Sequence, residues 1–196
     1  MSQKLDIIVI DDFYHNVDDV REFALQQKFD VTGNFPGYRT KSMINDIIKE
    51  AIEYVVYPWG GKVTNWFDDK YTGAFQYTTE EHHSWIHSDG GNDWAAVLYL
   101  TPNAPLSAGT AFYRHKETKE DRYIHKTETP TEEDLKHPYL RDYKDITKWE
   151  ITDYVSNKYN RLVLYRASLF HKSLDYFGKG LHDGRLFQVF FFNTQN

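Results

Sequence analysis

The chain has 196 residues, of which 40% are hydrophobic and 17% aromatic, and this suits one domain with a substantial buried core. It contains no cysteine, which excludes disulfides, thiolate nucleophiles and thiolate metal sites. Any bound metal must therefore be held by His, Asp or Glu. The net charge of −6 disfavours electrostatic binding of nucleic acid or anionic lipid, so we expect neither as a partner.

The hydropathy pattern bears on location. No apolar run approaches the ~20 residues of a membrane span, so we expect no membrane insertion. The first ten residues, MSQKLDIIVI, are too short and too charged for a secretory signal peptide. We expect a cytoplasmic protein that is a monomer or a homodimer.

Residues 1–62 read as an opening strand followed by two supporting helices. The strand is KLDIIVIDDF, and the first helix is NVDDVREFALQQKF, with Asn16 able to cap it. The second helix, SMINDIIKEAIEYVVY, repeats apolar residues at i, i+3, i+4 and i+7 and should stop at Pro58 and Gly60-Gly61. We expect both helices to pack on one face of a sheet.

From residue 63 onward the pattern changes to short β-rich runs separated by Gly, Pro, Asn and Asp. No helix-length apolar repeat separates the first three runs, which favours antiparallel pairing over parallel winding. We predict a mostly β protein with flanking helices (α+β), with residues 63–196 as a jelly-roll core in one domain spanning 1–196. The runs are TGAFQYTT, WAAVLYLT, GTAFYRH, RLVLYRASLFH and GRLFQVFFFN.

Residues 115–158 interrupt this rhythm. They hold 20 charged residues in 44, of both signs, with aromatic residues interleaved. Thr131 and Asp134 have the spacing of a capping box ahead of a short helix. The segment is interpreted either as a solvated excursion or as a lid over the mouth of the barrel, and the sequence does not decide between them.

The stretch HHSWIHSDGG contains the first part of a candidate metal site. His87 and Asp89 are two residues apart, so in an extended segment their side chains point to the same face. His171 ends a predicted strand and can supply a third ligand. Two imidazoles and one carboxylate form the facial triad that leaves positions open on a non-haem Fe(II). His182 is the rival third ligand, but it lies in a Gly-rich turn.

Arg185 opens the last apolar strand. It shares a strand face with Phe187 and Val189, and so it should point inward. A buried arginine needs an anionic partner, and a bound dicarboxylate would provide one by bidentate pairing.

Several other polar residues have two readings. Trp85 either walls a substrate pocket or packs in the core, and Arg166 is either a second inward cation near that pocket or a cross-strand surface partner. The remaining histidines lie in polar stretches without partner spacing, and we expect them at the surface. They are His15, His82, His83, His115, His125 and His137.

Residues 63–196 resemble the Fe(II)- and 2-oxoglutarate-dependent dioxygenases, especially the prolyl-hydroxylase-like branch. The order His87-x-Asp89, His171, Arg185 matches the family, and GTAF resembles its glycine turn. The resemblance implies a double-stranded β-helix in which His87, Asp89 and His171 hold Fe(II). It further implies that Arg185 and Tyr99 hold the far carboxylate of 2-oxoglutarate, with Tyr77 beside the co-substrate.

The implied reaction uses O2, converts 2-oxoglutarate to succinate and CO2, and hydroxylates a C–H bond of a protein, peptide or amino acid side chain. The implied reaction is also compatible with ascorbate as a further cofactor. The alternative is a cupin-like module that binds a metal or a small acid without turnover. A halogenase is disfavoured by Asp89, because halogenases replace this ligand with a small residue. A zinc hydrolase would leave Tyr77, Tyr99 and Arg185 without a purpose.

Overall fold

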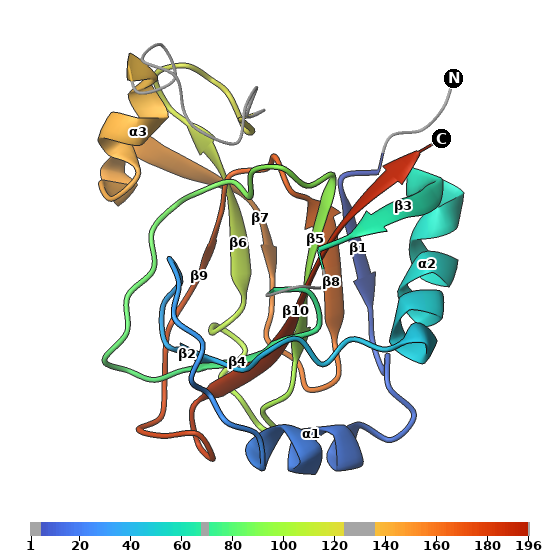
Figure 1. Ribbon diagram of the computed structural model, residues 1–196. Coiled ribbons are helices and arrows are strands. Elements are labelled where there is room, and N and C mark those ends of the chain that lie inside the picture. Colours follow the sequence, from blue (N-terminus) through green and yellow to red (C-terminus); the bar gives the residue numbers. More distant parts are fainter. Residues whose placement is uncertain (1–4, 68–70, 124–135, 196) are drawn as a thin grey trace.

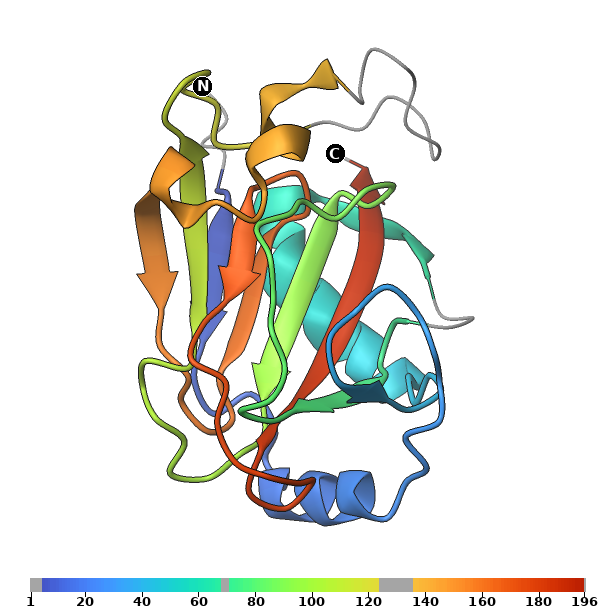
Figure 2. The same ribbon diagram turned by 90° about the vertical axis from the view of Figure 1, so that its left-hand side faces the viewer.

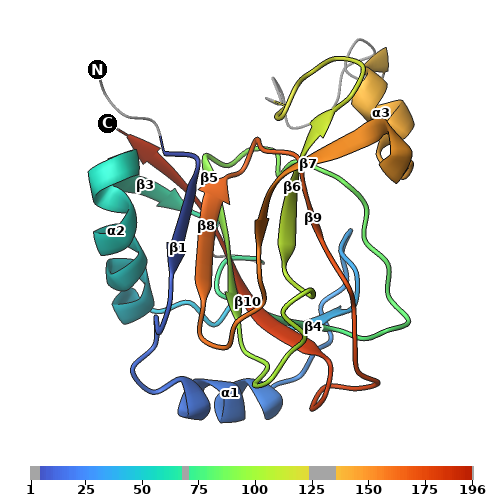
Figure 3. The same ribbon diagram turned by 180° about the vertical axis from the view of Figure 1, so that it is seen from behind.

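The computed structural model describes residues 5–67, 71–123 and 136–195, which form two antiparallel sheets with helices on the outside (Figure 1). The larger sheet has the order β1-β8-β5-β10-β4-β2, with β3 also paired to β10, and the smaller sheet has the order β7-β6-β9. Figure 3 shows β1, β8, β5 and β10 on one side and β7, β6 and β9 on the other. The predicted mostly β fold with flanking helices is confirmed.

The bounds of the elements follow in chain order. The strands are β1 (Ile7–Ile10), β2 (Tyr38–Arg39), β3 (Lys62–Trp66), β4 (Phe75–Thr78), β5 (Trp94–Tyr99), β6 (Thr110–His115), β7 (Trp149–Val155), β8 (Leu162–Arg166), β9 (His171–Ser173) and β10 (Arg185–Gln195). The helices are α1 (Val17–Leu25), α2 (Asp46–Gly60), α3 (Pro138–Asp142) and the 3-10 turn η2 (Ile146–Lys148).

Helix α2 covers the outer face of the larger sheet. It lies behind β5 and β10 in Figure 2, and its buried residues Ile52 and Val56 join the core cluster that contains Trp94 and Phe190. Asn45 caps the helix by accepting a hydrogen bond from Ile48 N at 3.0 Å, a role the sequence analysis missed.

The predicted start of α1 and the predicted end of α2 are each confirmed only in part. Asn16 occupies the cap position of α1 but makes no side-chain capping bond, because its backbone (φ −121°, ψ 48°) is not the extended conformation from which a cap reaches the first turn. Helix α2 continues through Pro58 and ends at Gly60, so the predicted stop at Gly60-Gly61 is confirmed and the one at Pro58 is not. The next residue, Gly61, has a φ of 79°, in the left-handed region that glycine adopts without strain.

Strand β10 shows how the pleat separates the two cores. Its residues Leu186, Phe190 and Phe192 belong to the core cluster under the helices, whereas Phe187 and Val189 belong to the cluster between the sheets. Because side chains alternate along a strand, Arg185 points the same way as Phe187, into the space between the sheets.

The predicted insert 115–158 has the wrong bounds. His115 is the last residue of β6, and residues 149–155 form β7, which pairs with β6 from Thr110↔Val155 to His115↔Trp149. The segment's polar composition concealed this strand because β7 is the edge of its sheet and most of its side chains are exposed. The predicted capping box of Thr131 and Asp134 lies outside the described residues.

Among the helices of the described ranges, none combines the length and apolar character needed to span a membrane.

Candidate metal centre and cofactor pocket

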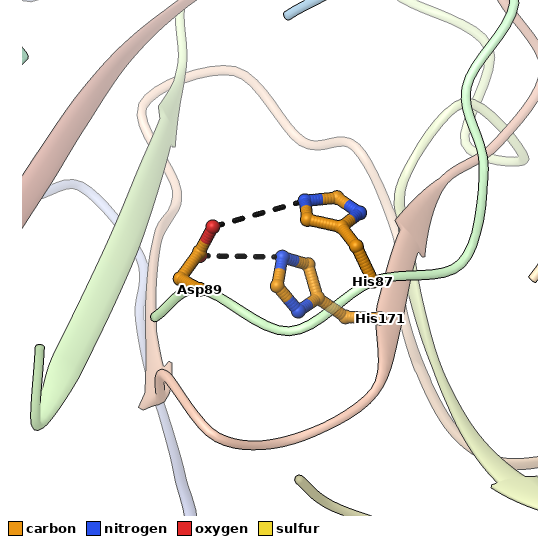
Figure 4. Close-up of side chains that lie close together, drawn as sticks. All are labelled: His87, Asp89 and His171. Carbon is orange, nitrogen blue, oxygen red and sulfur yellow. Dashed lines mark ion pairs between the residues drawn. The ribbon is translucent and has the colours of Figure 1, made fainter. Parts of the chain in front are cut away.

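The side chains of three potential metal ligands, His87, Asp89 and His171, lie close together between the two sheets (Figure 4). The segment just before β5 runs antiparallel to the start of β9, and two backbone hydrogen bonds join His87 to His171, N to O in each direction, at 3.1 and 2.8 Å. Asp89 N donates to Ala167 O at 2.8 Å. One ligand atom from each of His87, Asp89 and His171 lies within 4.8 Å of the others. Backbone pairing therefore fixes all three side chains around one point.

The hydrogen bonds of the two imidazoles select the atom that each offers. His87 Nδ1 donates to Trp85 O at 3.1 Å, and His171 Nδ1 donates to Leu169 O at 2.9 Å. Each Nε2 therefore carries the lone pair that a metal ion would use, and the two nitrogens lie 3.8 Å and 3.4 Å respectively from the nearest oxygen of Asp89. Metal bonds of about 2.1 Å at right angles place ligand atoms about 3 Å apart, so small side-chain shifts suffice to bind an ion.

The electrostatic environment suits coordination by neutral imidazole. Burial is the main cause that lowers the pKa of His171 to about 4, and the nearby ring of His87 lowers it further. His171 is therefore neutral at physiological pH, as a metal ligand must be. The Tyr165 hydroxyl lies 3.1 Å from His171 Nε2, and burial raises the pKa of this tyrosine well above its usual value.

Arg185 places a buried positive charge next to the three candidate metal ligands. Only 1% of the residue is exposed, and its Nε donates to Ala108 O at 3.0 Å. Neither Nη1 nor Nη2 has a hydrogen-bond partner among the described residues. The guanidinium carbon lies 4.5 Å from the Phe187 ring centre and 5.2 Å from that of Tyr99. A buried guanidinium with an unused edge is built to receive an anion, and a carboxylate fits that edge by bidentate pairing.

Tyr99 and Thr110 stand beside this guanidinium. The Tyr99 hydroxyl and Thr110 Oγ1 are 2.8 Å apart and both residues are buried. Tyr99 was predicted from the sequence. Thr110 was not singled out, although it is the threonine of the GTAF turn and lines the cavity.

A cavity of about 470 Å³ contains the candidate site. Its lining includes the three metal-ligating candidates, Arg185 and Trp85, so Trp85 walls the pocket. The part of residues 116–148 that the structure describes does not line the cavity, which gives the lid reading no support there. The opposite wall comes from residues 34–39, including Arg39, and from Gln76 of β4. Sequence reasoning missed both polar residues, and Arg39 was missed because nothing in NFPGYRT distinguishes a pocket wall from a surface loop.

Two candidate pocket residues lie elsewhere. Tyr77 points to the helix side of the larger sheet, where its ring stacks on Tyr38 at 5.0 Å and meets the edge of Phe29 at 5.1 Å. The inward position in β4 belongs to its neighbour, Gln76, because alternate residues face opposite sides. Arg166 likewise leaves the pocket, and its guanidinium lies 4.1 Å from the ring centre of Trp94, its cross-strand partner.

The other histidines mostly fall outside the site. His15, His83 and the rival ligand His182 are exposed, whereas His82 and His137 are half-buried. His125 lies outside the described residues.

The surface prediction for His115 is wrong. The residue is fully buried, and its Nε2 lies 3.1 Å from Asp142 Oδ2. This pair joins β6 to α3, and the His115 ring also packs edge-on against Trp149 of β7.

The two antiparallel sheets form a double-stranded β-helix, and the His-Asp-His group lies between them. The chain belongs to the family described as "Family of unknown function (DUF6445)", whose model matches residues 1–186. No curated protein matches the sequence.

Solved structures with this fold cover nearly the whole chain. HygX from Streptomyces hygroscopicus, with nickel and 2-oxoglutarate bound, is 13% identical with a TM-score of 0.62, over 98% of this chain and 84% of its own. SnoK, a non-haem α-ketoglutarate-dependent carbocyclase from nogalamycin biosynthesis, is 10% identical with a TM-score of 0.62, over 97% and 80%. A Trichoplax adhaerens prolyl hydroxylase in complex with a peptide fragment of hypoxia inducible factor is 10% identical with a TM-score of 0.52, over 95% and 83%. These likenesses confirm the predicted fold.

Proposed function

We propose that this protein is a non-haem Fe(II)- and 2-oxoglutarate-dependent oxygenase that hydroxylates a C–H bond of its substrate. The observation that carries the proposal is the pairing of two features in one cavity. One is the facial group of His87, Asp89 and His171, and the other is the buried, unpaired guanidinium edge of Arg185. The nickel and 2-oxoglutarate bound in HygX, which has the same fold, support this reading, as does the α-ketoglutarate dependence of SnoK.

The residues present fit both cofactors. His87, Asp89 and His171 would hold Fe(II) and leave three positions open. Arg185 would hold the far carboxylate of 2-oxoglutarate, with the Tyr99–Thr110 hydroxyl pair alongside. When bound, the iron and 2-oxoglutarate supply the oxidising chemistry, in which O2 is consumed, 2-oxoglutarate becomes succinate and CO2, and a C–H bond becomes C–OH.

The protein's own contribution is orientation and exclusion of water. Backbone carbonyls two residues before each histidine fix both imidazole tautomers, as described above. The inner wall is apolar where Val97, Phe187 and Val189 line the cavity, which keeps water from the reacting centre.

The rival functions account for less of the site. A zinc hydrolase or a metal-binding cupin could use the same three ligands, but neither needs a buried guanidinium with an open edge. A halogenase is disfavoured by the carboxylate of Asp89, which lies within 4 Å of both imidazoles. The expected substrate is a protein, a peptide or an amino acid side chain.

The test is anaerobic titration of the purified protein with Fe(II) and then 2-oxoglutarate, recording the weak visible charge-transfer band of the chelate. We expect the band in the parent protein, its loss in Asp89→Ala, and at least a tenfold higher 2-oxoglutarate requirement in Arg185→Met. Glu81→Ala and Arg114→Met remove an exposed carboxylate and an exposed guanidinium, and both should behave like the parent.

Absence of the band in a folded parent protein that also binds no Fe(II) would exclude the oxygenase and leave a jelly-roll binding module. A band that persists unchanged in Arg185→Met would remove 2-oxoglutarate from the proposal. Formation of succinate from 2-oxoglutarate in air then tests turnover.

A further inference from the structure

The cavity holds a second buried cation that the proposed iron and 2-oxoglutarate chemistry does not use. Arg39 of β2 is 6% exposed and lines the same cavity as the three metal-ligating candidates. One face of its guanidinium lies on the ring of Phe35, with 3.7 Å between the guanidinium carbon and the ring centre. The ring centre of Tyr71 lies 5.3 Å away.

A neutral partner holds this guanidinium in place. Arg39 Nε donates to Gln76 Oε1 at 2.8 Å, and Nη2 donates to the same oxygen. Gln76 is fixed in turn, because its Nε2 donates to Pro36 O at 2.6 Å. Within residues 5–67, 71–123 and 136–195, Arg39 forms no ion pair, and Nη1 has no hydrogen-bond acceptor. The end-on edge of the guanidinium is therefore oriented and unused, which is the edge that a carboxylate binds with two parallel hydrogen bonds.

The charges in the cavity leave Arg39 without compensation. Burial is the main cause that lowers the pKa of Arg39, to about 10, so the residue is charged at neutral pH. The carboxylate of Asp89 opposes this shift in the pKa of Arg39, and the Tyr71 hydroxyl opposes it to a smaller extent. A divalent ion bound by Asp89 and two neutral imidazoles, together with dianionic 2-oxoglutarate and Arg185, would sum to no net charge. One positive charge then remains, on Arg39.

The surroundings of Arg39 are aromatic. Phe35, Phe67, Tyr71 and Phe191 line the cavity on this side. The cavity's volume of about 470 Å³ must hold 2-oxoglutarate as well, which leaves room for a small molecule. A single positive charge next to apolar walls matches a monoanion with an apolar body.

We propose that Arg39 binds the carboxylate of the primary substrate, so that the substrate is a small carboxylic acid with an apolar body, such as a free amino acid or a related organic acid. This inference rests on the proposed oxygenase function and names its substrate class. Gln76 acts as a positioning residue that holds the guanidinium edge toward the cavity.

The test uses the protein loaded with Fe(II) and saturating 2-oxoglutarate without oxygen, so that Arg185 is already engaged. The probes are 3-phenylpropanoate and its uncharged analogue 3-phenylpropanamide, and the readout is the shift of the visible chelate band. We expect the carboxylate to perturb the band at a concentration at least tenfold lower than the amide, as the loss of a charge-assisted hydrogen-bond pair predicts. Inorganic phosphate should perturb it no better than the amide.

Two variants test the role of Arg39. Arg39→Met should remove the preference for the carboxylate, and Arg39→Lys should keep part of it. Gln76→Glu loses the bond to Pro36 O but keeps the acceptor for Arg39 and gives the guanidinium an internal counter-ion, so it should also abolish the preference. All three should retain the chelate band with an unchanged 2-oxoglutarate requirement, which shows that the site has folded.

The two proposals fail differently. No chelate band in the parent protein would overturn the oxygenase function itself. A normal band with equal responses to carboxylate and amide, or a preference that survives in both Arg39→Met and Gln76→Glu, would overturn the role of Arg39. A response to phosphate equal to that of the carboxylate would overturn the carboxylic-acid class.

Discussion

Arg185 carries an unbalanced charge in the protein without ligands. Its guanidinium is buried and two of its nitrogens lack partners among the described residues. Because an unpaired buried cation destabilises the folded state, Arg185→Met should raise the free energy of unfolding of the ligand-free protein, by about 1–3 kcal/mol. Urea denaturation without 2-oxoglutarate measures this.

The matched control is Arg161→Met. Arg161 Nε donates to Asp11 Oδ1 at 2.6 Å, so its guanidinium already has a counter-ion, and the substitution should lower stability. If both variants lose stability, the unpaired guanidinium of Arg185 does not destabilise the ligand-free protein.

Two tyrosines near the larger sheet should differ in their effect on 2-oxoglutarate. Tyr99→Phe removes the hydroxyl that pairs with Thr110 beside Arg185, and we expect the Kd for 2-oxoglutarate to rise about tenfold. Tyr77→Phe should leave the Kd unchanged, because Tyr77 packs on Tyr38 on the other face of β4. The chelate band gives both values, and equal effects would contradict this assignment.

Individual site residues can be predicted from the sequence where the local backbone geometry determines which way their side chains point. His87 and Asp89 were found because a two-residue spacing in an extended segment brings side chains to one face. Tyr77 was placed beside the co-substrate from the family resemblance alone, whereas the alternation of β4 turns Gln76 toward the cavity and Tyr77 away from it. Arg39 was missed because its partnership with Gln76 depends on β2 pairing with β4, which is a tertiary contact.

Asp11 links the end of β1 to the start of β8. It accepts hydrogen bonds from Arg161 and Lys158, and these hold the pKa of Asp11 well below its usual value. A depressed folded-state pKa means stabilisation that is fully present above the unfolded value of about 4 and is lost as pH falls below it. Asp11→Asn should therefore destabilise the protein at pH 7, by less than about 1 kcal/mol because the side chain is partly exposed, and progressively less toward pH 3.

Urea denaturation of the parent and of Asp11→Asn across this pH range measures the difference. Asp12→Asn is the control, since Asp12 is exposed and its positive φ of 55° is tolerated by asparagine. A difference between Asp11→Asn and the parent that stays constant with pH would show that Asp11 acts without its charge.

Elements were predicted best where periodicity was long. The apolar repeat of α2 and the apolar runs of β5 and β10 were each recognised from the sequence. Strand β7 was not, because an edge strand with one solvated face and exposed Ile151 and Tyr154 carries no clear alternation. The buried pair of His115 and Asp142 was also missed, since polar residues of both signs surround it in the sequence.

At the scale of the whole molecule, ligand binding should raise the free energy of unfolding and the thermal midpoint. A ligand that binds only the folded state at a hundred times its Kd adds about 2.7 kcal/mol. For a chain of this size, Fe(II) and 2-oxoglutarate together should raise the thermal midpoint by roughly 5–10 °C under anaerobic conditions. EDTA should reverse the rise. Asp89→Ala should not show it, and an equal rise in that variant would place the binding elsewhere.

Strand β10 lies at the centre of the larger sheet, paired with β5 on one side and with β3 and β4 on the other. It also follows β3, β4 and β5 along the chain, so these strands are synthesised well before the partner that completes them. Until residues 185–195 leave the ribosome, these strands expose unpaired edges, and the non-local pairing that closes them is slow. The nascent chain should therefore depend on chaperones, and a chain cut before residue 185 would lose the sheet's central strand together with Arg185.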